Sequence, residues 1–437
     1  MKSFYFTKRK LQLVPAATFL VALAITTPLF AQSITTFDAP GAGTGPLQGT
    51  YATNINPSGT IIGFIRDATN VRHGFIRSQD GSFTIFDAPG AGTAAFQGTR
   101  AYATNPSGTI TGWFIDSVNA AHGYVRSDQG VITVFDAPGA GTGAGQGTRA
   151  YSINPSGTIT GFFNDAVNVF HGYVRSNQGM ITVFDAPGAG TAPGQGTFPF
   201  SPLIINPNGA ITGWATDSVF VSHGFLRDRN GGFTTFDVPG AGTGAGQGTF
   251  PFAISLGGEI TGFYIDATNA NHGFLRDKNG VIATYDVPGA GTGPHQGTFG
   301  GGFAPNGTIM RNYIDAGNLS HGFVLDNNGV FTTFDAPSAG TGPLQGTIPF
   351  GINASGAITG WYTDEANVNH GFVRDKHGAL VEFDVPGAGT GPGQGPNVYT
   401  IAPNGAVTGF FLDPANVVHG FVREAHGALG LSKFTGK

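Results

Sequence analysis

The chain has 437 residues, of which 40% are hydrophobic and only 11% are charged, and its formal net charge is −5. This hydrophobic content excludes a disordered chain, and the negative charge argues against nucleic acid and anionic lipid as partners. The absence of cysteine excludes disulfides, thiolate metal sites and a cysteine nucleophile. Glycine-rich loops between short apolar runs favour an all-β fold.

The first 31 residues differ in composition from the rest of the chain. Four basic residues within the first ten are followed by an apolar stretch over 11–30 and by the small residue Ala31. This pattern predicts a secretory signal peptide over 1–31. An uncleaved membrane anchor is the alternative, although Pro15 and Pro28 interrupt a continuous spanning helix. After cleavage, 17 basic and 26 acidic residues remain, a formal charge of about −9, and no membrane span is expected.

The segment after the signal peptide carries a motif that belongs to the end of a repeat. The sequence Phe-Asp-x-Pro-Gly begins at Phe37, before the first complete repeat, and returns near the end of the repeats that follow, with Tyr285 in place of Phe once. The last repeat lacks it, since its fourth run is GALGLSKF (427–434). We therefore expect the N-terminal ITTFD (34–38) to supply the missing strand and remove an exposed sheet edge.

A His-Gly dipeptide followed by Phe or Tyr recurs eight times, at steps of 49 residues except for one step of 52. A period near 50 indicates a supersecondary unit that stacks on its neighbours to bury its faces. Residues 32–437 are therefore expected to form a single domain of eight repeats of about 49 residues.

The repeat over 99–136 shows the pattern of one unit. Four β-type runs are separated by turns, two of them at 105–108 and 128–130, and no run resembles an amphipathic helix. The fourth run, 131–135, is largely apolar on both faces, so we expect it to be covered on two sides. Four-stranded units in radial repetition predict an eight-bladed β-propeller. A parallel β-solenoid is the alternative, although its rungs are about half this length.

An aspartate stands six residues before the histidine in each of the eight periodic His-Gly dipeptides. One interpretation is purely structural: the Asp and Asn side chains hydrogen-bond the backbone of their own hairpin loops, and the imidazole hydrogen-bonds a group of a loop. In the functional interpretation these side chains bind a ligand. The candidate ligand-binding residues are Asp67, His73, Asp116, His122, Asp165, His171, Asp217, His223, Asp266, His272, Asp315, His321, Asp364, His370, Asp413 and His419.

The sequence indicates no metal or cofactor. Carboxylate oxygens could serve Ca²⁺, but no segment has the spacing of a dedicated calcium loop. One histidine per repeat is not a zinc signature. The glycine-rich loops are followed by no helix and no Lys-Ser/Thr pair, so they are not phosphate cradles.

The Pro-Gly of each Phe-Asp-x-Pro-Gly motif fits the centre of a type II turn, with glycine at positive φ and the preceding aspartate capping the turn. Ser338 replaces this glycine once, so that turn must differ or be strained. In a four-stranded blade these loops and the Asp–His loops open on the same face. We expect them to crowd one end of the channel, as a site for a sugar, peptide or cation.

Catalysis is not favoured, because the same residues recur around the ring whereas an enzyme site needs one asymmetric set of groups. The sixth repeat is the least typical, with Arg311 and Leu325 at positions held elsewhere by Gly and Arg, and it shows no nucleophile–base pair.

The repeats resemble the HAF family of extracellular repeat proteins. The resemblance rests on Ile-Asn-Pro-Ser-Gly-x-Ile-x-Gly, as in 153–161, followed by His-Gly-Phe-hydrophobic-Arg, as in 73–77. The family pattern has His-Ala-Phe, so Gly74 and its equivalents depart from it. The resemblance implies an exported bacterial protein with a β-propeller and carries over no catalytic residues.

Together these features predict a non-catalytic binding module that is secreted, periplasmic or on the cell surface. We expect a monomer that binds carbohydrate or protein at its loop-rich face. A polysaccharide hydrolase or lyase that uses the loop Asp and His residues, and a structural envelope protein, are the alternatives.

Overall fold

The computed structural model describes residues 33–201, 203–304 and 306–425. The predicted signal peptide and the segment 427–434 lie outside these residues. The described residues form 33 β-strands and no helix, and these strands join in one hydrogen-bonded sheet. None of the described residues forms a helix that could cross a membrane.

Consecutive strands pair antiparallel to form four-stranded units, which we number 1 to 8 in chain order. The first strands are β2 (Gly49–Ile55), β6 (Gly98–Thr104), β10 (Gly147–Ile153), β14 (Gly196–Phe198), β18 (Gly248–Ile254), β22 (Gly297–Thr298) with β23 (Gly302–Phe303), β27 (Gly346–Ile352) and β31 (Gly395–Ile401). The second strands are β3 (Ile61–Arg66), β7 (Ile110–Ile115), β11 (Ile159–Asn164), β15 (Ile211–Thr216), β19 (Ile260–Ile265), β24 (Ile309–Ile314), β28 (Ile358–Thr363) and β32 (Val407–Leu412).

The third and fourth strands complete each unit. The third strands are β4 (Arg72–Arg77), β8 (Ala121–Arg126), β12 (Phe170–Arg175), β16 (Ser222–Arg227), β20 (Asn271–Arg276), β25 (Ser320–Leu325), β29 (Asn369–Arg374) and β33 (Val418–Arg423). The fourth strands are β5 (Phe83–Phe86), β9 (Ile132–Phe135), β13 (Ile181–Phe184), β17 (Phe233–Phe236), β21 (Ile282–Tyr285), β26 (Phe331–Phe334), β30 (Leu380–Phe383) and, in unit 8, β1 (Ile34–Phe37).

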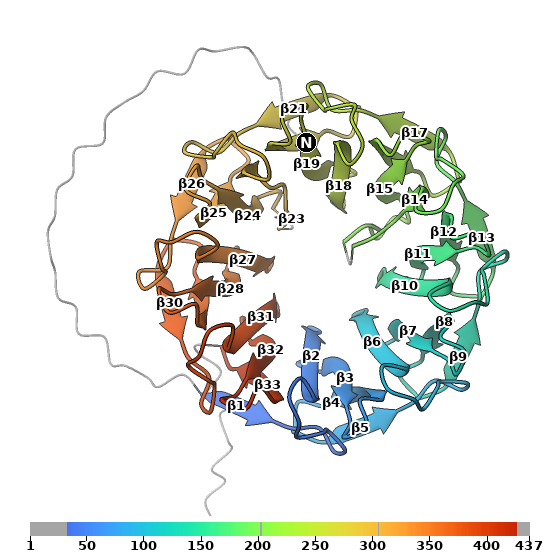
Figure 1. Cartoon of the computed structure of the whole chain (residues 1–437), viewed down its shortest axis with the longest axis vertical. Helices are drawn as coiled ribbons and strands as arrows, with labels where there is room; N and C mark the ends of the chain where they lie inside the picture. The colour runs from blue at the N-terminus through green and yellow to red at the C-terminus, as the bar shows by residue number, and fades with distance from the viewer. Residues whose placement is uncertain (1–32, 202, 305, 426–437) are drawn as a thin grey trace, which may run out of the picture. The chain divides into compact units, whose positions relative to one another are not determined.

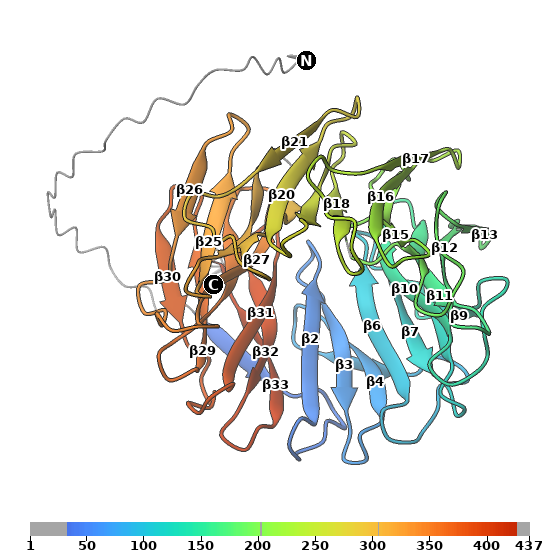
Figure 2. The same ribbon diagram turned by 45° about the horizontal axis from the view of Figure 1, so that its top comes forward.

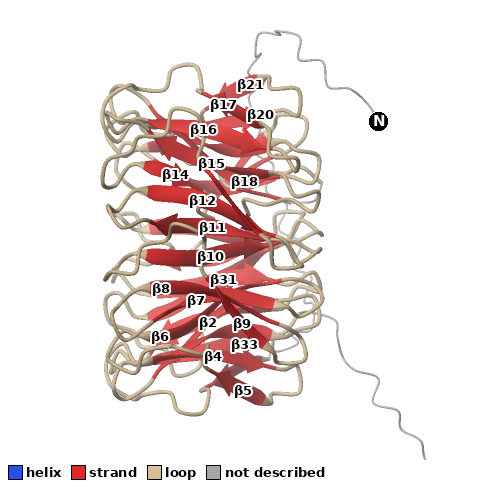
Figure 3. Ribbon diagram, turned by 90° about the vertical axis from the view of Figure 1, so that its right-hand side faces the viewer, coloured by secondary structure: helices blue, strands red, loops and turns tan. Residues whose placement is uncertain are grey.

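The all-β fold of four-stranded units is confirmed, and the antiparallel pairing within units rules out a parallel solenoid. The units stand around a common axis, with first strands such as β2 and β6 innermost and fourth strands such as β5 and β9 at the perimeter (Figure 1). Tilting the view shows β31, β2 and β6 side by side along the inner wall (Figure 2). In side view the loops lie at the two ends of the strands (Figure 3). This is a propeller-like arrangement.

Strand β1 lies at the place predicted for the N-terminal segment 34–38, beside the third strand of the last unit. It pairs antiparallel with β33, from Ile34 opposite Arg423 to Phe37 opposite Gly420. Strand β33 also contacts β2, since Gly49 of β2 forms a parallel bridge with Val418 of β33. Strand β33 of unit 8 is thus paired with two strands from the start of the described chain, β1 and β2.

Glycine begins every first strand because the units approach each other closely at that point. Gly98 has φ 93°, and a Cβ atom there would lie 2.1 Å from the carbonyl oxygen of Arg72 in the preceding unit. No side chain fits that distance, so the repeated Gln-Gly pair marks the contact between units.

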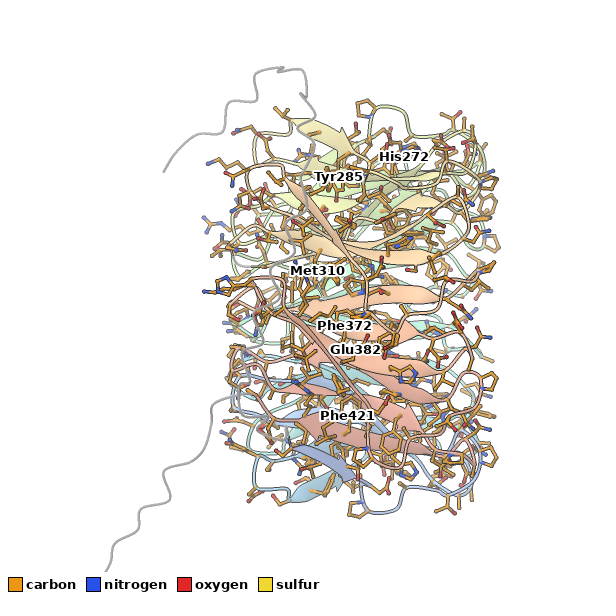
Figure 4. The ribbon with its side chains drawn as sticks, turned by 90° about the vertical axis from the view of Figure 1, so that its left-hand side faces the viewer. His272, Tyr285, Met310, Phe372, Glu382 and Phe421 are labelled. Atoms are coloured by element: carbon orange, nitrogen blue, oxygen red, sulfur yellow. The ribbon has the colours of Figure 1, made fainter. Side chains whose placement is uncertain are left out.

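The core lies between neighbouring units. The aromatic residue after each His-Gly is fully buried, and Figure 4 shows two of these residues, Phe372 and Phe421, at corresponding places in successive units. The hydrophobic cluster around Tyr124 of unit 2 includes Ile62 and Phe86 of unit 1. Neither unit completes this core alone, as expected of stacked repeats.

The arginine that ends most third strands fastens one unit to the one before it. Arg126 places its guanidinium 5.2 Å from the ring of Phe86, and Arg175 lies 5.0 Å from Phe135. In unit 6 Leu325 replaces the arginine and packs in one apolar cluster with Tyr285, which replaces the phenylalanine. The departure noted in the sequence is therefore a matched pair of changes.

The expectation that the fourth strand is covered on both faces is wrong. Val131, next to β9, is 65% exposed, and Thr133 within the strand is also exposed, while Phe135 is buried. Strands at the perimeter lie where radially arranged sheets diverge. One face of β9, with Ile132 and Val134, packs against the hydrophobic cluster around Tyr124, whereas Thr133 on the other face is exposed.

Unit 6 carries a second matched change, at Arg311. The glycine at this position in other units allows a first-strand carbonyl oxygen to come within about 2 Å of where a Cβ would lie, as at Gly161. In unit 6 three glycines, 300–302, replace the middle of the first strand. The Arg311 guanidinium occupies the space, 5.1 Å from the ring of Phe252 and 5.4 Å from that of Phe350.

The turn that contains Ser338 differs from its equivalents, as predicted. Gly41 at the same place in another copy has φ 86°, whereas Ser338 is not among the residues with positive φ. Its backbone N–H and its hydroxyl donate to the two carboxylate oxygens of Glu382, at 2.8 and 2.9 Å. Glu382 thus fixes the altered turn from the next unit.

Candidate functional site

Each predicted aspartate closes the hairpin between the second and third strands. In unit 1, Oδ1 of Asp67 accepts the backbone N–H groups of Thr69 and Val71, both at 2.8 Å. Asn70 between them has φ 66°, a left-handed conformation that asparagine tolerates better than most residues. The same bonds recur in unit 2, from Val118 and Ala120 to Asp116. The capping role assigned from the sequence is confirmed.

Each predicted histidine bridges two carboxylates. Nδ1 of the imidazole lies 2.6–2.9 Å from a second aspartate, which follows the histidine by 14 residues in seven units, and Nε2 lies 3.2–3.6 Å from the hairpin aspartate. We call each such trio an Asp–His–Asp cluster. The hairpin aspartate and histidine of every pair thus come together. The second aspartates are Asp87, Asp136, Asp185, Asp237, Asp286, Asp335, Asp384 and, for His419, Asp38.

Sequence reasoning missed these second aspartates, which it interpreted only as turn caps. The signal was present: the aspartate of each Phe-Asp-x-Pro-Gly motif follows a His-Gly by 14 residues in seven units. Only His419 lacks a partner at that spacing, and Asp38 from the N-terminal segment takes the place at 2.9 Å. The cluster of unit 8 therefore joins the two ends of the described chain.

Hydrogen bonds shift the pKa values of histidine and of the hairpin aspartate in opposite directions, as in unit 1. The bond to Asp87 raises the pKa of His73 above its ordinary value, although burial acts against it. The pKa values of His122 and His171 are raised for the same reason. Burial acts to raise the pKa of Asp67, but the bonds from Thr69, Val71 and His73 outweigh burial and lower it. The hydrogen bonds thus favour the charged forms of both His73 and Asp67.

The clusters do not crowd one end of the channel as the sequence predicts. Each histidine lies on a third strand and its Nδ1 partner directly follows a fourth strand, which runs at the perimeter (Figure 1). The clusters therefore stand around the outer part of one face, separate from one another. Their polar atoms already bond to each other and to the hairpin backbone, which leaves little capacity for a shared ligand.

No metal geometry arises from this arrangement. Within 33–201, 203–304 and 306–425, no group of three or more His, Asp or Glu side chains is placed to hold a metal ion. The carboxylate oxygens of each cluster face an imidazole instead.

The opposite face carries clefts between neighbouring units. One, of about 340 Å³, lies between units 2 and 3 and is lined by Ser107, Thr109, Val125, Thr133 and Arg175. A second, of about 450 Å³, lies between units 3 and 4. Its lining includes the matching residues of the next unit along, Ser156, Thr158, Val174, Thr182 and Arg227.

The chemistry of the two clefts is alike. Hydroxyl and amide side chains come from the Asn-Pro-Ser-Gly turn and from the fourth strand, and Val125 or Val174 supplies an apolar surface. Arg175 donates to the carbonyl oxygen of Ser176 at 3.3 Å and keeps a fixed position against the ring of Phe135. Sequence reasoning missed the clefts because each is built from residues of two repeats.

Comparison with known proteins identifies no relative by sequence: no family model and no curated protein matches this chain. Among solved structures, a prolyl endopeptidase matches with a TM-score of 0.52 and 12% identity, covering 83% of this chain. The chain spans 54% of that endopeptidase. At this identity the likeness shows a propeller-like fold and carries no activity.

Two further solved structures are more distant. A puromycin hydrolase matches with a TM-score of 0.45 and 11% identity, covering 85% of this chain and 59% of its own. The BP39L lectin from Burkholderia pseudomallei matches with a TM-score of 0.43 and 9% identity, covering 76% of this chain and 98% of its own.

Proposed function

We propose that this chain is an exported, non-catalytic binding module that takes saccharides in the clefts between neighbouring units. In this proposal the mature protein is a monomeric eight-bladed propeller closed by β1, of the kind that the HAF resemblance implies. The observation that carries the proposal is the pair of clefts between units 2, 3 and 4, which repeat the same lining from one unit to the next.

The cleft chemistry suits a sugar. A pyranose presents several hydroxyl groups and an apolar C–H face, and it is bound by side chains that donate and accept hydrogen bonds beside a small apolar surface. Ser156 and Thr158 supply hydroxyls to one cleft, and Val174 and Met180 supply the apolar surface. Repeated weak sites also suit a polymer, because several occupied sites add to the overall avidity.

The Asp–His–Asp clusters support a non-catalytic role. A general acid or base needs a free oxygen or nitrogen that reaches the substrate. Here Oδ1 of Asp67 bonds two backbone N–H groups, and Nδ1 of His73 bonds Asp87 at 2.8 Å. These groups are engaged in holding the second, third and fourth strands of one unit together.

A glycan array probed with the mature chain, followed by calorimetry with the best ligand, tests the proposal. We expect the double variant Thr133→Lys/Thr182→Lys to weaken binding by about tenfold or more, because both threonines are exposed on the cleft wall. Val167→Lys is the matched control, since Val167 is 59% exposed on the opposite face. Absence of any bound glycan, or equal affinity of the double variant and the wild type, would overturn the proposal.

A further inference from the structure

Four arginines break the repetition of the ring in units 1 to 3. Arg66 ends β3 and Arg72 begins β4, while Arg100 and Arg149 each stand third in the first strands β6 and β10. The residues equivalent to Arg100 in units 4 to 8 are Phe198, Phe250, Phe299, Ile348 and Asn397. Register brings Arg72 to the start of β6, two residues before Arg100, since Gly98 bridges Arg72 on the Asp–His–Asp face.

The arginines alternate with aromatic rings to form what we call the arginine ladder. The Arg66 guanidinium lies 5.2 Å from the ring of Tyr51, which stacks on Phe64 at 4.7 Å. Arg100 follows at 5.1 Å from Phe64 and 4.7 Å from Trp113. Arg149 then lies 5.7 Å from Trp113 on its other side. Guanidinium groups and rings thus run continuously across three units.

Phe96 covers the outer end of the ladder in a strained conformation. Its ring lies 5.7 Å from both the Arg66 and the Arg72 guanidinium groups, and 55% of the residue is exposed. Its φ is 68°, and positive φ belongs to this loop position in every copy, whether the residue is glycine, as at Gly145, or bulky, as at Leu344. What distinguishes Phe96 is its exposed aromatic ring beside two guanidinium groups.

No acidic side chain balances these charges. Every ion pair of the described residues joins a histidine to an aspartate. Arg66 and Arg149 donate to uncharged oxygens, of Leu47 and of Asn164 and Gly145.

Arg72 is the most buried member of the ladder. It is only 7% exposed and its Nε has no partner. Burial, reinforced by repulsion from Arg100 and Arg66, lowers its pKa to about 9. Nε of Arg100 is likewise buried without a partner. An anion placed here would relieve repulsion that the chain itself leaves uncompensated.

We propose that the arginine ladder binds the carboxylate or sulfate group of an acidic saccharide, with Phe96 stacked on the sugar ring. Guanidinium groups bind carboxylate and sulfate oxygens in two-pronged pairs, and an exposed ring fits a pyranose face. The net charge of −5 disfavours a long polyanion such as nucleic acid and leaves a local site for one anionic group. The ladder and the clefts lie on opposite faces, so this inference is independent of binding in the clefts.

Titration of the mature protein with three oligosaccharides tests the inference, with tryptophan fluorescence as the readout because Trp113 lies in the ladder. The probes are an oligogalacturonate, its methyl ester and a sulfated galactan oligosaccharide. We expect saturable binding of the oligogalacturonate, if the ligand group is a carboxylate, or of the sulfated oligosaccharide, if it is a sulfate. The neutral methyl ester is expected to bind about tenfold more weakly or not at all. Equal binding of the ester, or no binding of either acidic probe, would overturn the inference.

Variants locate the binding. Arg100→Gln is expected to weaken binding of the acidic probe by about tenfold, whereas Lys278→Gln, at an exposed lysine on the opposite face that lines neither cleft, leaves it unchanged. Phe96→Gly introduces the glycine that four other copies carry at this position, so it keeps the fold and is expected to weaken binding several-fold.

Two results contradict the assignment: full affinity in both the Arg100 and Phe96 variants, or tighter binding of a single-stranded oligonucleotide of equal charge. Acidic-probe binding is expected to persist in Thr133→Lys/Thr182→Lys, so failure at the clefts and failure at the ladder give different results.

Discussion

The Asp–His–Asp clusters and the arginine ladder are the two charged features of the same face, and they are organised in opposite ways. The clusters recur in every unit, lie toward the perimeter and satisfy their own charges, as in His171 between Asp165 and Asp185. The ladder occurs in three units only, lies at the inner end of the face and has no acidic partner. In a repeat protein, residues that recur in every unit maintain the scaffold. Charged residues that occur in only a few units and have no acidic partner are better candidates for binding a ligand.

The departures of unit 6 sharpen this distinction. Leu325 is matched by Tyr285, Arg311 by the loss of side chains at 300–302, and Ser338 by Glu382 of the next unit. Each of these changes has a compensating neighbour within the protein, so none requires a ligand. The ladder has no such neighbour.

The largest expected effect tests whether unit 8 is scaffold like the others. Phe37→Ala in β1 and Phe135→Ala in β9 remove matched rings, each 9% exposed and each covered by an arginine at 4.9 or 5.0 Å. Both variants are expected to lose about 3–5 kcal/mol, because a large ring leaves the core. Thermal denaturation followed by circular dichroism measures this. A melting temperature unchanged in Phe37→Ala and lowered in Phe135→Ala would show that β1 does not complete the ring.

The next effect tests the glycine of the second strand. A Cβ at Gly161 would lie 2.0 Å from the carbonyl oxygen of Arg149, so Gly161→Ala is expected to cost about 1–3 kcal/mol through displaced backbone. Gly143→Ala is the control, since its Cβ meets only the flexible end of Gln146. Equal melting temperatures for the two variants would contradict the close approach, which unit 6 avoids by its glycine-rich first strand.

The smallest effect concerns the clusters and depends on pH. The pKa of His171 is raised above its ordinary 6.5, so its stabilisation is complete below pH 6.5 and is lost as pH rises through the folded value. The pKa of Asp165 is lowered below 3.8, so its stabilisation is present above pH 3.8 and is lost as pH falls through the folded value. The cluster therefore stabilises most between those two ordinary values.

His171→Gln is accordingly expected to lower the melting temperature by about 1 °C between pH 4 and 6.5, and by less on either side, since a partly exposed ion pair contributes about 0–1 kcal/mol. His377→Gln, at an exposed histidine outside the clusters, serves as the control. A difference that stays constant from pH 4 to pH 9 would show that packing, not charge, is what His171 contributes.

Local chemistry made much of this fold predictable. The turns at 105–108 and 128–130, the capping role of Asp67 and the place of β1 all follow from residue types at short spacing. A turn or a cap is decided within a few residues, so one repeat read closely was enough.

The second aspartates of the clusters and the arginine ladder were not predicted, because strand register and the packing of neighbouring units bring their residues together. Asp87 meets His73 only because β4 and β5 pair so that Gly74 lies opposite Phe86. The ladder joins Arg66 and Arg72, which flank the hairpin of unit 1, to Arg100 and Arg149 in the first strands of units 2 and 3. Alignment of the repeats shows such residues as isolated exceptions, and only the stacking of neighbouring sheets brings them into one site.

The contact between His419 and Asp38 spans 381 residues. Because translation starts at the amino end, β1 is made before any other strand and its partner β33 is made last. The pairing of β1 with β33 can therefore form only after the last described strand has been made, and deletion of either strand removes it.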